Sequence, residues 1–393
     1  MKVLLLPVIK NKAGKIGSSD NYRPIALANT LSKVFELILL PKFAKIVMST
    51  ENQFGFKPKH GTDMCIYGLK ELLINYNSKN STVFLCFLDA TKAFDRVNQR
   101  KLFLKLCQVG VPKYIVRCLS YWYANQTMQV TWDNCMSASF HVNTGVRQGS
   151  ILSPILFNFY MNDLSKQLNL CRTGCMVGDT IINHLMYADD LVVFSPSSAG
   201  LQELLNVCSA YGELHDVKFN PSKSTILICR TKEDKNRLFP KFKLSGSLLK
   251  VSPEVKYLGH MLTDCLSNDE DIYRQVRMLY AQANILVRKF GFCSDEVKLN
   301  LFRSYCTSLY TAHLWCNFKK ASLQKLKVAY NDALRLLLNK PRWSSASELF
   351  VSARVSTLMA VLRKLMYRFI CRLNESNNKI ILLLANVKYS ASM

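Results

Sequence analysis

Leu185-Met-Tyr-Ala-Asp-Asp-Leu-Val-Val-Phe194 is an apolar run of strand-forming residues that is interrupted only by the adjacent carboxylates Asp189 and Asp190. Two neighbouring carboxylates are costly to bury, because each ion loses its hydration. The pattern therefore predicts a tight β-hairpin that exposes the aspartate pair at its tip, where a divalent cation would offset the charge. An ordinary Asp-Asp turn between two strands is the alternative, and this stretch alone leaves both open.

The charge of the whole chain points to a polyanionic partner. Its 393 residues suffice for two or three domains, and 52 Lys and Arg against 27 Asp and Glu give a net charge of +25. Such a balance is atypical of a metabolic enzyme and indicates nucleic acid binding. The 14 cysteines contain no CxxC pair, which predicts reduced cysteines in the core of an intracellular protein rather than a metal site or disulfides.

No segment predicts a membrane partner. The apolar stretch 4–9 contains Pro7 and runs directly into Lys10, and 380–387 is also too short to span a bilayer.

Apolar periodicity and capping residues predict an alternation of strands and helices along the chain. Strands are expected at 3–9, 82–88, 175–177 and 255–262, and as hairpins at 128–142 and 185–194. Residues 219–228 are expected to form a turn followed by a strand. Helices are expected at 25–47, at 62–77 with Thr62 or Asp63 as cap, at 98–109, after Pro112, at 153–168 with Ser153 as cap, and at 198–214.

Beyond about residue 267 the pattern changes to long basic helices. Residues 266–393 contain 20 Lys and Arg against 8 Asp and Glu, a net charge of +12. We therefore expect a domain boundary there, with one domain at 1–265 and a helical one at 266–393.

A third carboxylate, outside the hairpin, is a candidate partner for Asp189 and Asp190. Asp89 ends the buried-strand pattern at 82–88, one hundred residues before Asp189. A carboxylate at a strand end facing others at a hairpin tip suits two Mg²⁺ ions, one activating a primer 3′-hydroxyl and the other binding the triphosphate. Mg²⁺ keeps much of its shell as water and phosphate oxygen, so a few carboxylates suffice.

With these residues in place, an ordered set of motifs resembles the reverse transcriptases of non-long-terminal-repeat (LINE-type) retrotransposons. The set spans about residues 3–262 and comprises Asn21-Tyr-Arg-Pro-Ile25, Gln53-Phe-Gly-Phe56, Phe87-Leu-Asp-Ala-Thr-Lys-Ala-Phe-Asp95, Gly145-Val-Arg-Gln-Gly149 with Leu152-Ser-Pro154, Tyr187-Ala-Asp-Asp190, Asn220-Pro-Ser-Lys223 and Tyr257-Leu-Gly259.

The resemblance implies an α+β right-hand polymerase with fingers, palm and thumb, an antiparallel palm sheet packed on helices, and a helical basic C-terminal region. It implies RNA-directed DNA polymerase activity with an RNA template, a DNA primer and dNTPs as partners, and two Mg²⁺ ions, with Mn²⁺ as a substitute. A nuclear location is expected from the template.

The resemblance also implies the role of each site residue. The metal-binding catalytic carboxylates would be Asp89, Asp189 and Asp190. The triphosphate would meet Arg23, and Lys223 would contact phosphate or act as a general acid. The nucleotide pocket would include Gln148 and Gly149, and Tyr187 would lie under the primer terminus. For Arg23 and Lys223, solvated surface charge is the alternative.

Phe94 is the residue that would select the sugar. It lies five positions after Asp89, where the family places an aromatic ring under the 2′ carbon of the sugar. RNA-dependent RNA polymerases put an aspartate at that offset, whereas here the aspartate comes one position later, at Asp95. The resemblance therefore implies a DNA product.

Some features depart from the family pattern. Ser150-Ile151 stands where a small residue and proline are usual, and Lys57-Pro-Lys-His-Gly61 is less arginine-rich than is typical. The chain lacks the family's N-terminal extension, endonuclease signature and zinc knuckle, so a fragment of an element is expected. A catalytically silent nucleic-acid-binding scaffold is the alternative function. A group II intron maturase would need a splicing domain that 266–393 does not reveal.

Overall fold

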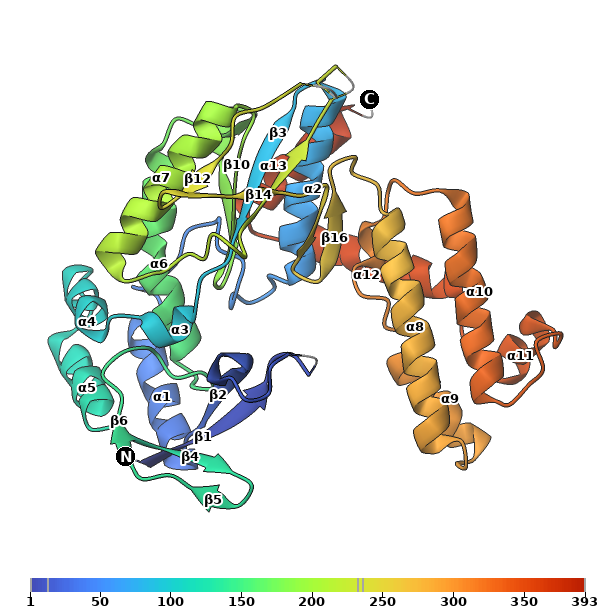
Figure 1. Ribbon diagram of the computed structural model, residues 1–393, viewed down its shortest axis with the longest axis horizontal. Coiled ribbons are helices and arrows are strands. Elements are labelled where there is room, and N and C mark those ends of the chain that lie inside the picture. The colour runs from blue at the N-terminus through green and yellow to red at the C-terminus, as the bar shows by residue number, and fades with distance from the viewer. Residues whose placement is uncertain (1, 13, 232, 235–236, 392–393) are drawn as a thin grey trace. The chain divides into compact units, whose positions relative to one another are not determined.

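The computed structural model describes residues 2–12, 14–231, 233–234 and 237–391. Helices and strands are mixed along the chain, so the predicted α+β class is confirmed (Figure 1).

A five-stranded sheet contains the apolar stretch 185–194 with its two aspartates. Its strand order is β14-β11-β3-β10-β9. The strands are β3 (Val83–Leu88), β9 (His184–Tyr187), β10 (Asp190–Ser195), β11 (Thr225–Cys229) and β14 (Lys250–Val251). All six residues of β3 are buried, as a central strand of apolar residues requires. β9 and β10 pair antiparallel, with Asp190 opposite Tyr187, so the predicted hairpin is confirmed.

The chain divides into two compact units. The first comprises residues 1–60, 86–225 and 239–250, and the second 61–85, 226–238 and 251–393. The chain passes between them within β3, β11 and β14. The chain therefore changes from one unit to the other several times rather than once. The domain boundary expected at residue 265 stays a prediction.

The first unit contains a second sheet. Its order is β2-β1-β4-β5, with β6 also pairing to β4. The strands are β1 (Lys2–Ile9), β2 (Tyr22–Leu27), β4 (Thr127–Trp132), β5 (Cys135–Met136) and β6 (Phe140–His141). β1 pairs antiparallel with β2 and parallel with β4, so segments far apart in sequence form one sheet.

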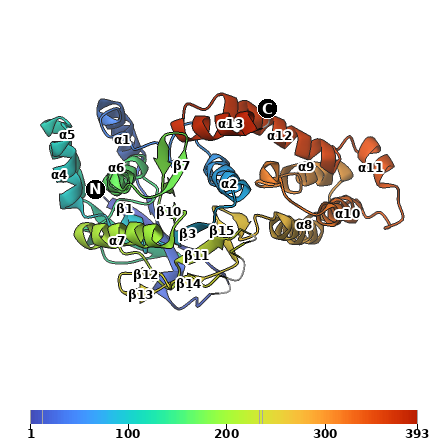
Figure 2. The same cartoon turned by 90° about the horizontal axis from the view of Figure 1, so that it is seen from above.

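In the first unit, α7 lies along β10 and beside α6 (Figures 1 and 2). The N-terminal turns of α4 and α7 are capped by Asn98, which accepts from Lys101 N at 3.0 Å, and by Ser197, which accepts from Gly200 N at 3.0 Å. The helices are α1 (Thr30–Phe43), α3 (Ala93–Arg96), α4 (Gln99–Gln108), α5 (Lys113–Ala124), α6 (Ser153–Leu170) and α7 (Ser198–His215).

Short hairpins complete the first unit. β7 (Cys175–Val177) pairs with β8 (Thr180–Ile182), and β12 (Lys243–Leu244) pairs with β13 (Ser247–Leu248).

The second unit is mainly helical, as predicted for the C-terminal part. α8 and α10 pack side by side around a core that includes Phe302, Leu326 and Tyr330 (Figure 2). Its elements are α2 (Thr62–Ser78), β15 (Glu254–Tyr257), β16 (His260–Thr263), α8 (Asp269–Phe290), α9 (Asp295–Tyr305), α10 (Lys320–Leu337), α11 (Ala346–Ser352), α12 (Leu358–Asn374) and α13 (Lys379–Ala391).

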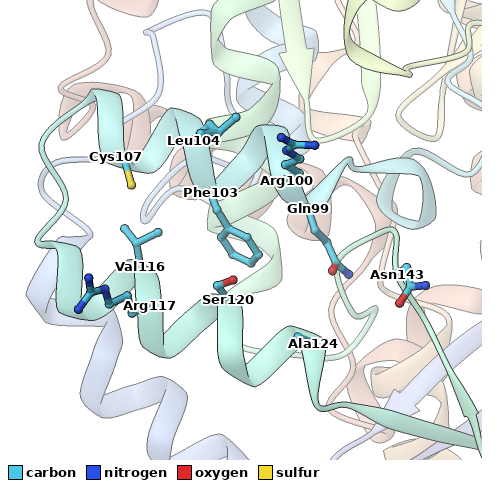
Figure 3. A pocket seen from close by; sticks show the side chains of 10 residues that line it. All are labelled: Gln99, Arg100, Phe103, Leu104, Cys107, Val116, Arg117, Ser120, Ala124 and Asn143. Atoms are coloured by element: carbon cyan, nitrogen blue, oxygen red, sulfur yellow. The ribbon is translucent and has the colours of Figure 1, made fainter.

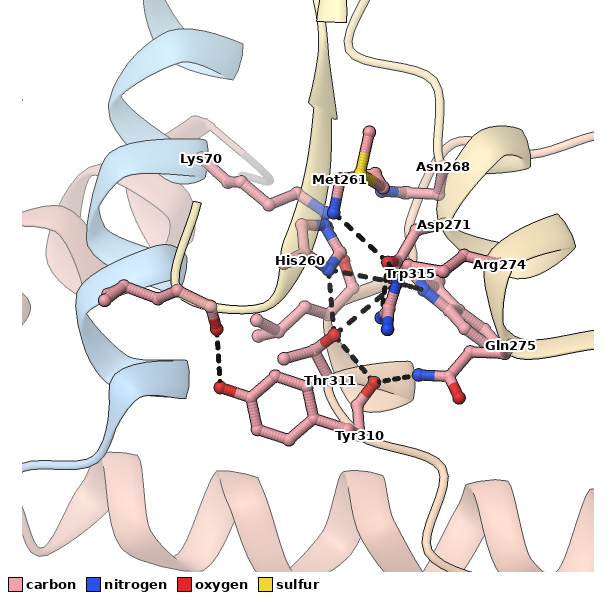
Figure 4. A network of polar contacts seen from close by, with 12 residues as sticks. Lys70, His260, Met261, Asn268, Asp271, Arg274, Gln275, Tyr310, Thr311 and Trp315 are labelled. Atoms are coloured by element: carbon pink, nitrogen blue, oxygen red, sulfur yellow. Dashed lines mark hydrogen bonds and ion pairs between the residues drawn. The ribbon is translucent and has the colours of Figure 1, made fainter. Parts of the chain in front are cut away.

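A buried carboxylate, Asp271 of α8, joins the segments of the second unit (Figure 4). It accepts from Trp315 Nε1 at 2.8 Å and from Arg274 Nη2 at 2.7 Å, and its oxygen lies 3.1 Å from His260 Nδ1. Burial by itself would raise the pKa of Asp271, but the hydrogen bonds and charges of these partners hold it well below its usual range. The carboxylate is thus fully compensated, as a buried charge must be.

Two element predictions are corrected by the structure. The helix expected at 25–47 begins only at Thr30, because residues 22–27 pair with β1 and Asn29 caps the helix. The single strand expected at 255–262 is the hairpin β15–β16, which turns at Leu258 and Gly259, both with positive φ.

Two predicted helix caps are also wrong. α2 is preceded by Gly61, so Thr62 and Asp63 lie inside the helix. α6 has Leu152 at its N-cap, so Ser153 is the first helical residue, followed by Pro154.

The cysteine side chains are only partly as predicted. All 14 cysteines are free thiols, although five of them are exposed rather than in the core. Among the described residues, no helix has both the length and the apolar character needed to cross a bilayer.

Asp63 of α2 anchors α12 within the second unit. Its carboxylate accepts from Arg372 and lies 3.1 Å from His313 Nε2. Burial alone would raise the pKa of Asp63, yet the hydrogen bonds of His313 and Arg372 and the charge of Arg372 lower it to about 2.

We therefore expect Asp63→Asn to lower the free energy of unfolding by about 2 kcal/mol at neutral pH. Because the folded pKa is depressed, this contribution is present above about pH 4 and is lost as the pH falls through about 2. Urea unfolding of both proteins across this range measures it, with the exposed-turn variant Asp133→Asn as control. A difference that persists undiminished at acid pH would contradict the assignment.

Candidate active site

The turn between β9 and β10 is held by a side chain from far away in the sequence. Gln53 Oε1 accepts from Ala188 N at 2.9 Å and from Gly55 N at 2.8 Å, and Gln53 Nε2 donates to Ala188 O at 3.3 Å. Ala188 has a φ of 56°, a conformation that residues with a Cβ rarely adopt. The Gln53 amide thus satisfies the backbone of the strained turn that presents Asp189 and Asp190.

The residues around Gln53 lie alongside β9. Met186 N donates to Asn52 O and Phe54 N donates to Met186 O, each at 2.8 Å. Gly55 approaches the turn so closely that an added Cβ would lie 2.3 Å from Ala188 N. The motif Gln53-Phe-Gly-Phe56 therefore supports the hairpin through its contacts with β9 and Ala188. The sequence alone does not predict this role.

The carboxylate at the end of β3 has its own support. Asp89 N donates to Ser224 Oγ at 3.2 Å, and Asn220 N donates to Asp89 O at 2.8 Å. Asn220 Oδ1 also accepts from Ser222 N at 3.0 Å, which folds the loop into an Asx turn. The motif Asn220-Pro-Ser-Lys223 thus fixes the backbone of Asp89.

The three predicted carboxylates interact electrostatically. Partial desolvation and the negative charges of Asp189 and Asp89 raise the pKa of Asp190 to about 6, although the side chain remains exposed. Desolvation and the charge of Asp89 also raise the pKa of Asp189. Arg23, exposed on β2, lowers both pKa values by its positive charge. The structure therefore brings these four predicted residues into one site.

The donor set fits a divalent cation by its chemistry. Carboxylate oxygens are the ligands that Mg²⁺ prefers, and a cation would relieve the repulsion that raises the pKa of Asp189 and Asp190. In the described part of the chain, no three His, Cys, Asp or Glu side chains already converge in a metal-ligating arrangement. The three carboxylates are therefore neighbours, but their oxygen atoms are not already arranged to bind a metal ion.

The predicted sugar-selecting residue is held by aromatic contacts. The half-buried ring of Phe94 stacks on Phe157 with centroids 4.3 Å apart and meets Phe56 edge to face at 6.2 Å. Both contacts restrict the rotation of the ring. A side chain fixed in this way can act as a steric barrier, because it cannot move aside for a bulkier sugar.

Phe94 is coupled to the loop that carries Gln148. Val146 N donates to Phe94 O at 2.8 Å, and Gln148 Nε2 donates to Asp95 Oδ1 at 3.0 Å. Burial raises the pKa of Asp95, which Gln148 partly counteracts. The sequence identifies Asp95 only as the aspartate one position after Phe94, and it does not predict the contact with Gln148.

A buried ion pair fixes the same loop from the other side. Arg147 Nη2 and Glu36 Oε1 are 2.6 Å apart, and both side chains are 2% exposed. Glu36 also accepts from Ser150 Oγ at 2.7 Å and from Ile151 N at 2.8 Å. The departure from the family pattern at Ser150-Ile151 thus supplies two donors to Glu36.

Gly149 allows the loop to approach β2. Its φ is +110°, and an added Cβ would lie 2.7 Å from Ala26 O. Ala26 N donates to Gln148 O at 2.7 Å, which ties the loop to the strand that bears Arg23. No larger residue would fit here without moving the backbone.

Lys223 lies with other cations around Asp20. Lys92 Nζ and Asp20 Oδ1 are 2.7 Å apart, and Lys10 Nζ donates to Asp20 O at 2.8 Å. The pKa of Asp20 is lowered by the hydrogen bond and charge of Lys92 and by the charges of Lys10 and Lys223. The sequence motif contains Lys92 but does not single it out, because its left-handed backbone conformation and its partner Asp20 depend on the fold.

The predicted residues thus fall into connected groups. Asp89, Asp189, Asp190 and Arg23 interact by charge, and half-buried Tyr187 ends the strand before them. Phe94, Gln148 and Gly149 form a second group tied to β2. The charge of exposed Lys223 lowers the pKa of Asp20 and is not among the causes that shift the pKa of Asp189 or Asp190. The role of each remains a prediction.

Comparison with known proteins places this geometry in a family. The sequence pattern of the family described as reverse transcriptase (RNA-dependent DNA polymerase) matches residues 9–262. An RNA-directed DNA polymerase from the mobile element jockey of Drosophila funebris is 25% identical over 376 residues, covering 92% of this chain and 40% of the relative. The Pol polyprotein of the element R2DM of Drosophila melanogaster is 31% identical over 207 residues, covering 52% and 19%.

Solved structures show only a distant likeness. Apo telomerase from Candida tropicalis has a TM-score of 0.45 at 13% identity and covers 90% of this chain and 55% of that one. Telomerase from Candida albicans with a fragment of telomeric RNA has a TM-score of 0.42 at 12% identity. The chain spans 40% and 42% of the length of the two jockey polymerases it matches.

The repulsion at the hairpin tip predicts a stabilising substitution. Because the folded pKa of Asp190 is raised to about 6, its charge destabilises the metal-free fold above that pH and not below about pH 4. Asp190→Asn is therefore expected to raise the free energy of unfolding by about 1 kcal/mol at neutral pH, a value reduced for solvent screening.

Thermal unfolding with and without Mg²⁺ tests this directly. Mg²⁺ should stabilise the unaltered chain more than the Asp190→Asn variant, since the variant has lost a ligand. Asp179→Asn, in the exposed turn between β7 and β8, removes the same charge as a control. Equal stabilisation of all three proteins by Mg²⁺ would argue against a metal site at the tip.

Proposed function

Because this chain belongs to the reverse transcriptase (RNA-dependent DNA polymerase) family, we propose that it extends a DNA primer by copying an RNA template, as part of a non-LTR retrotransposon. The chain spans less than half the length of the jockey relatives, so the activity, substrates and partners of a whole element protein are carried to it as proposals.

One observation carries the proposal. Besides partial desolvation, the charge of Asp89 at the end of β3 raises the pKa of both Asp189 and Asp190 at the tip of the β9–β10 hairpin, and the charge of Arg23 opposes this. A chain that only bound nucleic acid would have no need for three mutually repelling carboxylates among so many cations. The cost in stability supports a site kept for chemistry.

Reverse transcriptases generally use divalent metal ions, and we propose two Mg²⁺ here, with Mn²⁺ as a substitute. Asp89 and Asp189 would supply most of the bonds, with Asp190 beside them. When bound, the ions would activate the primer hydroxyl and neutralise the triphosphate.

The remaining residues bind and orient the substrates. Arg23, held on β2, would contact the triphosphate through its guanidinium. The cations Lys10, Lys92 and Lys223, which gather around Asp20, would meet phosphate groups in the same way. Nothing in this contact requires Lys223 to act as an acid, and phosphate binding is the simpler role.

The loop 145–149 would form one wall of the nucleotide pocket. Its attachment to β2 through Ala26 and to the Phe94 segment through Asp95 keeps Gln148 and Gly149 in place before the nucleotide arrives. Tyr187, at the end of β9, would support the primer terminus. We also propose a nuclear location, on the ground of the proposed template alone.

The first test is incorporation of dTTP on an oligo(dT)-primed poly(rA) template with Mg²⁺ or Mn²⁺. We expect incorporation by the unaltered chain and none by the Asp189→Asn, Asp190→Asn double variant, because that variant lacks the metal ligands. The control is Asp179→Asn, which should keep full activity. Folded, RNA-binding protein without incorporation would refute the polymerase and leave a nucleic-acid-binding scaffold.

Phe94 should set the choice of sugar. Phe94→Ala removes the ring that would clash with a 2′-hydroxyl, so we expect rUTP incorporation relative to dTTP to rise by a factor of roughly ten or more. Phe94→Tyr keeps the ring and should keep the discrimination. The ratio of kcat/KM for the two nucleotides measures the effect, and an unchanged ratio in Phe94→Ala would remove the gate assignment.

A further inference from the structure

The segment formed by α4, α5 and β4 has an unusual charge. From Gln99 to Trp132 the sequence contains no Asp or Glu, and its cations are Arg100, Lys101, Lys105, Lys113 and Arg117. An uninterrupted positive segment of this kind attracts a polyanion.

Two of these cations are used within the protein and three are not. Lys101 pairs with Asp216 at 2.8 Å, and Lys105 pairs with Asp163 at 2.9 Å. Across the described residues, Arg100, Lys113 and Arg117 have no acidic partner within 4.0 Å, and all three are exposed. Their charges are therefore available to a ligand.

A groove of about 470 Å³ lies between α4 and α5. Arg100 and Phe103 line it from α4 and Arg117 from α5, and none of its lining residues is acidic. Figure 3 shows the ring of Phe103 pointing from α4 toward Ser120 of α5, with the two arginines on either side of it. The groove thus combines an aromatic face with two cations.

The outer face of α5 extends this combination. Tyr114 and Tyr121 expose 59% and 73% of their surface. With Arg117 they occupy positions i, i+3 and i+7, which lie on one face of a helix. The two rings are about 10 Å apart along the axis, roughly the length of two or three stacked bases. Arg117 belongs to both the groove and this face.

We propose that the α4–α5 surface, made up of Arg100, Phe103, Lys113, Tyr114, Arg117 and Tyr121, binds single-stranded RNA. Cations beside exposed aromatic rings are the arrangement by which proteins hold single strands, with phosphates on the cations and unpaired bases on the rings. A duplex hides its base faces, so the tyrosines would gain nothing from it. An acidic peptide would satisfy the arginines but leave the rings without a matching face.

This surface is separate from the proposed polymerase site. None of the residues that line the groove is a predicted site residue. One contact links the two, because Gln99 at the groove donates through Nε2 to Gly145 O at 3.0 Å. RNA binding here needs neither a metal ion nor a nucleotide, so it can be measured whether or not the chain polymerises.

The tyrosines are tested by fluorescence anisotropy with a labelled oligo(rU) and the full chain. Tyr114→Ala with Tyr121→Ala should weaken binding about tenfold or more, because each base–ring stack contributes substantially. Tyr114→Phe with Tyr121→Phe retains the rings and should restore the affinity. A matched RNA duplex should bind both variants and the unaltered chain alike.

The arginines are tested by the salt dependence of the same binding. Arg100→Ala with Arg117→Ala should reduce the slope of log K against log salt by about 1.4, the value for two single-strand phosphates. Arg100→Lys with Arg117→Lys should restore it. Lys33→Ala with Lys42→Ala, two exposed cations of α1, is the charge-matched control and should leave the slope unchanged.

Two results would overturn the proposal. One is unchanged affinity and slope in both Ala variants, and the other is an equal loss for oligo(rU) and duplex. Failure of the polymerase assay would not bear on it, since binding is measured without Mg²⁺ and dNTP. Circular dichroism of each variant separates a lost contact from a lost fold.

Discussion

Repulsion among three carboxylates is the constraint on which the first unit depends. Partial desolvation and the charges of Asp189 and Asp89 raise the pKa of Asp190 to about 6, so the folded chain keeps this carboxylate charged at a cost. In a flexible structure, the hairpin tip would move away from Asp89 and so reduce the repulsion between the carboxylates. The surrounding structure must therefore be rigid at the two places where the aspartates are attached.

That rigidity comes from segments distant in sequence. Gln53 satisfies the backbone of the turn at Ala188, while Asn220 and Ser224 hold the backbone of Asp89. In each case, a motif with no catalytic residue of its own forms hydrogen bonds to a motif that contains one of the carboxylates. The Gly145–Gly149 loop follows the same plan, with Glu36 and Ala26 as its anchors. The motifs of this family are thus contacts of one framework as much as they are separate functional sites.

The sequence predicted what local patterns determine. The buried strand expected at 82–88, the hairpin around Asp189 and the helices expected at 98–109 and 198–214 follow from apolar periodicity. The two helix caps predicted from capping chemistry are wrong, since Gly61 and Leu152 hold those positions. It failed where a partner strand decides, as at residues 22–27, which pair with β1 instead of continuing into a helix. The contacts of Gln53, Glu36 and Lys92 join residues tens to over a hundred positions apart, and no local pattern carries that information.

The buried pair Glu36–Arg147 has a consequence for inheritance. Glu36 receives Arg147, Ser150 and Ile151 in a site where both charged side chains are 2% exposed. Losing either member leaves an isolated charge in the interior, a change of several kcal/mol in most proteins. Codons 36 and 147 therefore behave as one genetic target, in which a lesion at either is repaired only by reversion or by a matched second change. In a lineage of copies that accumulates random lesions, this pair would be among the earliest points at which a copy loses its fold while its three aspartates are still intact.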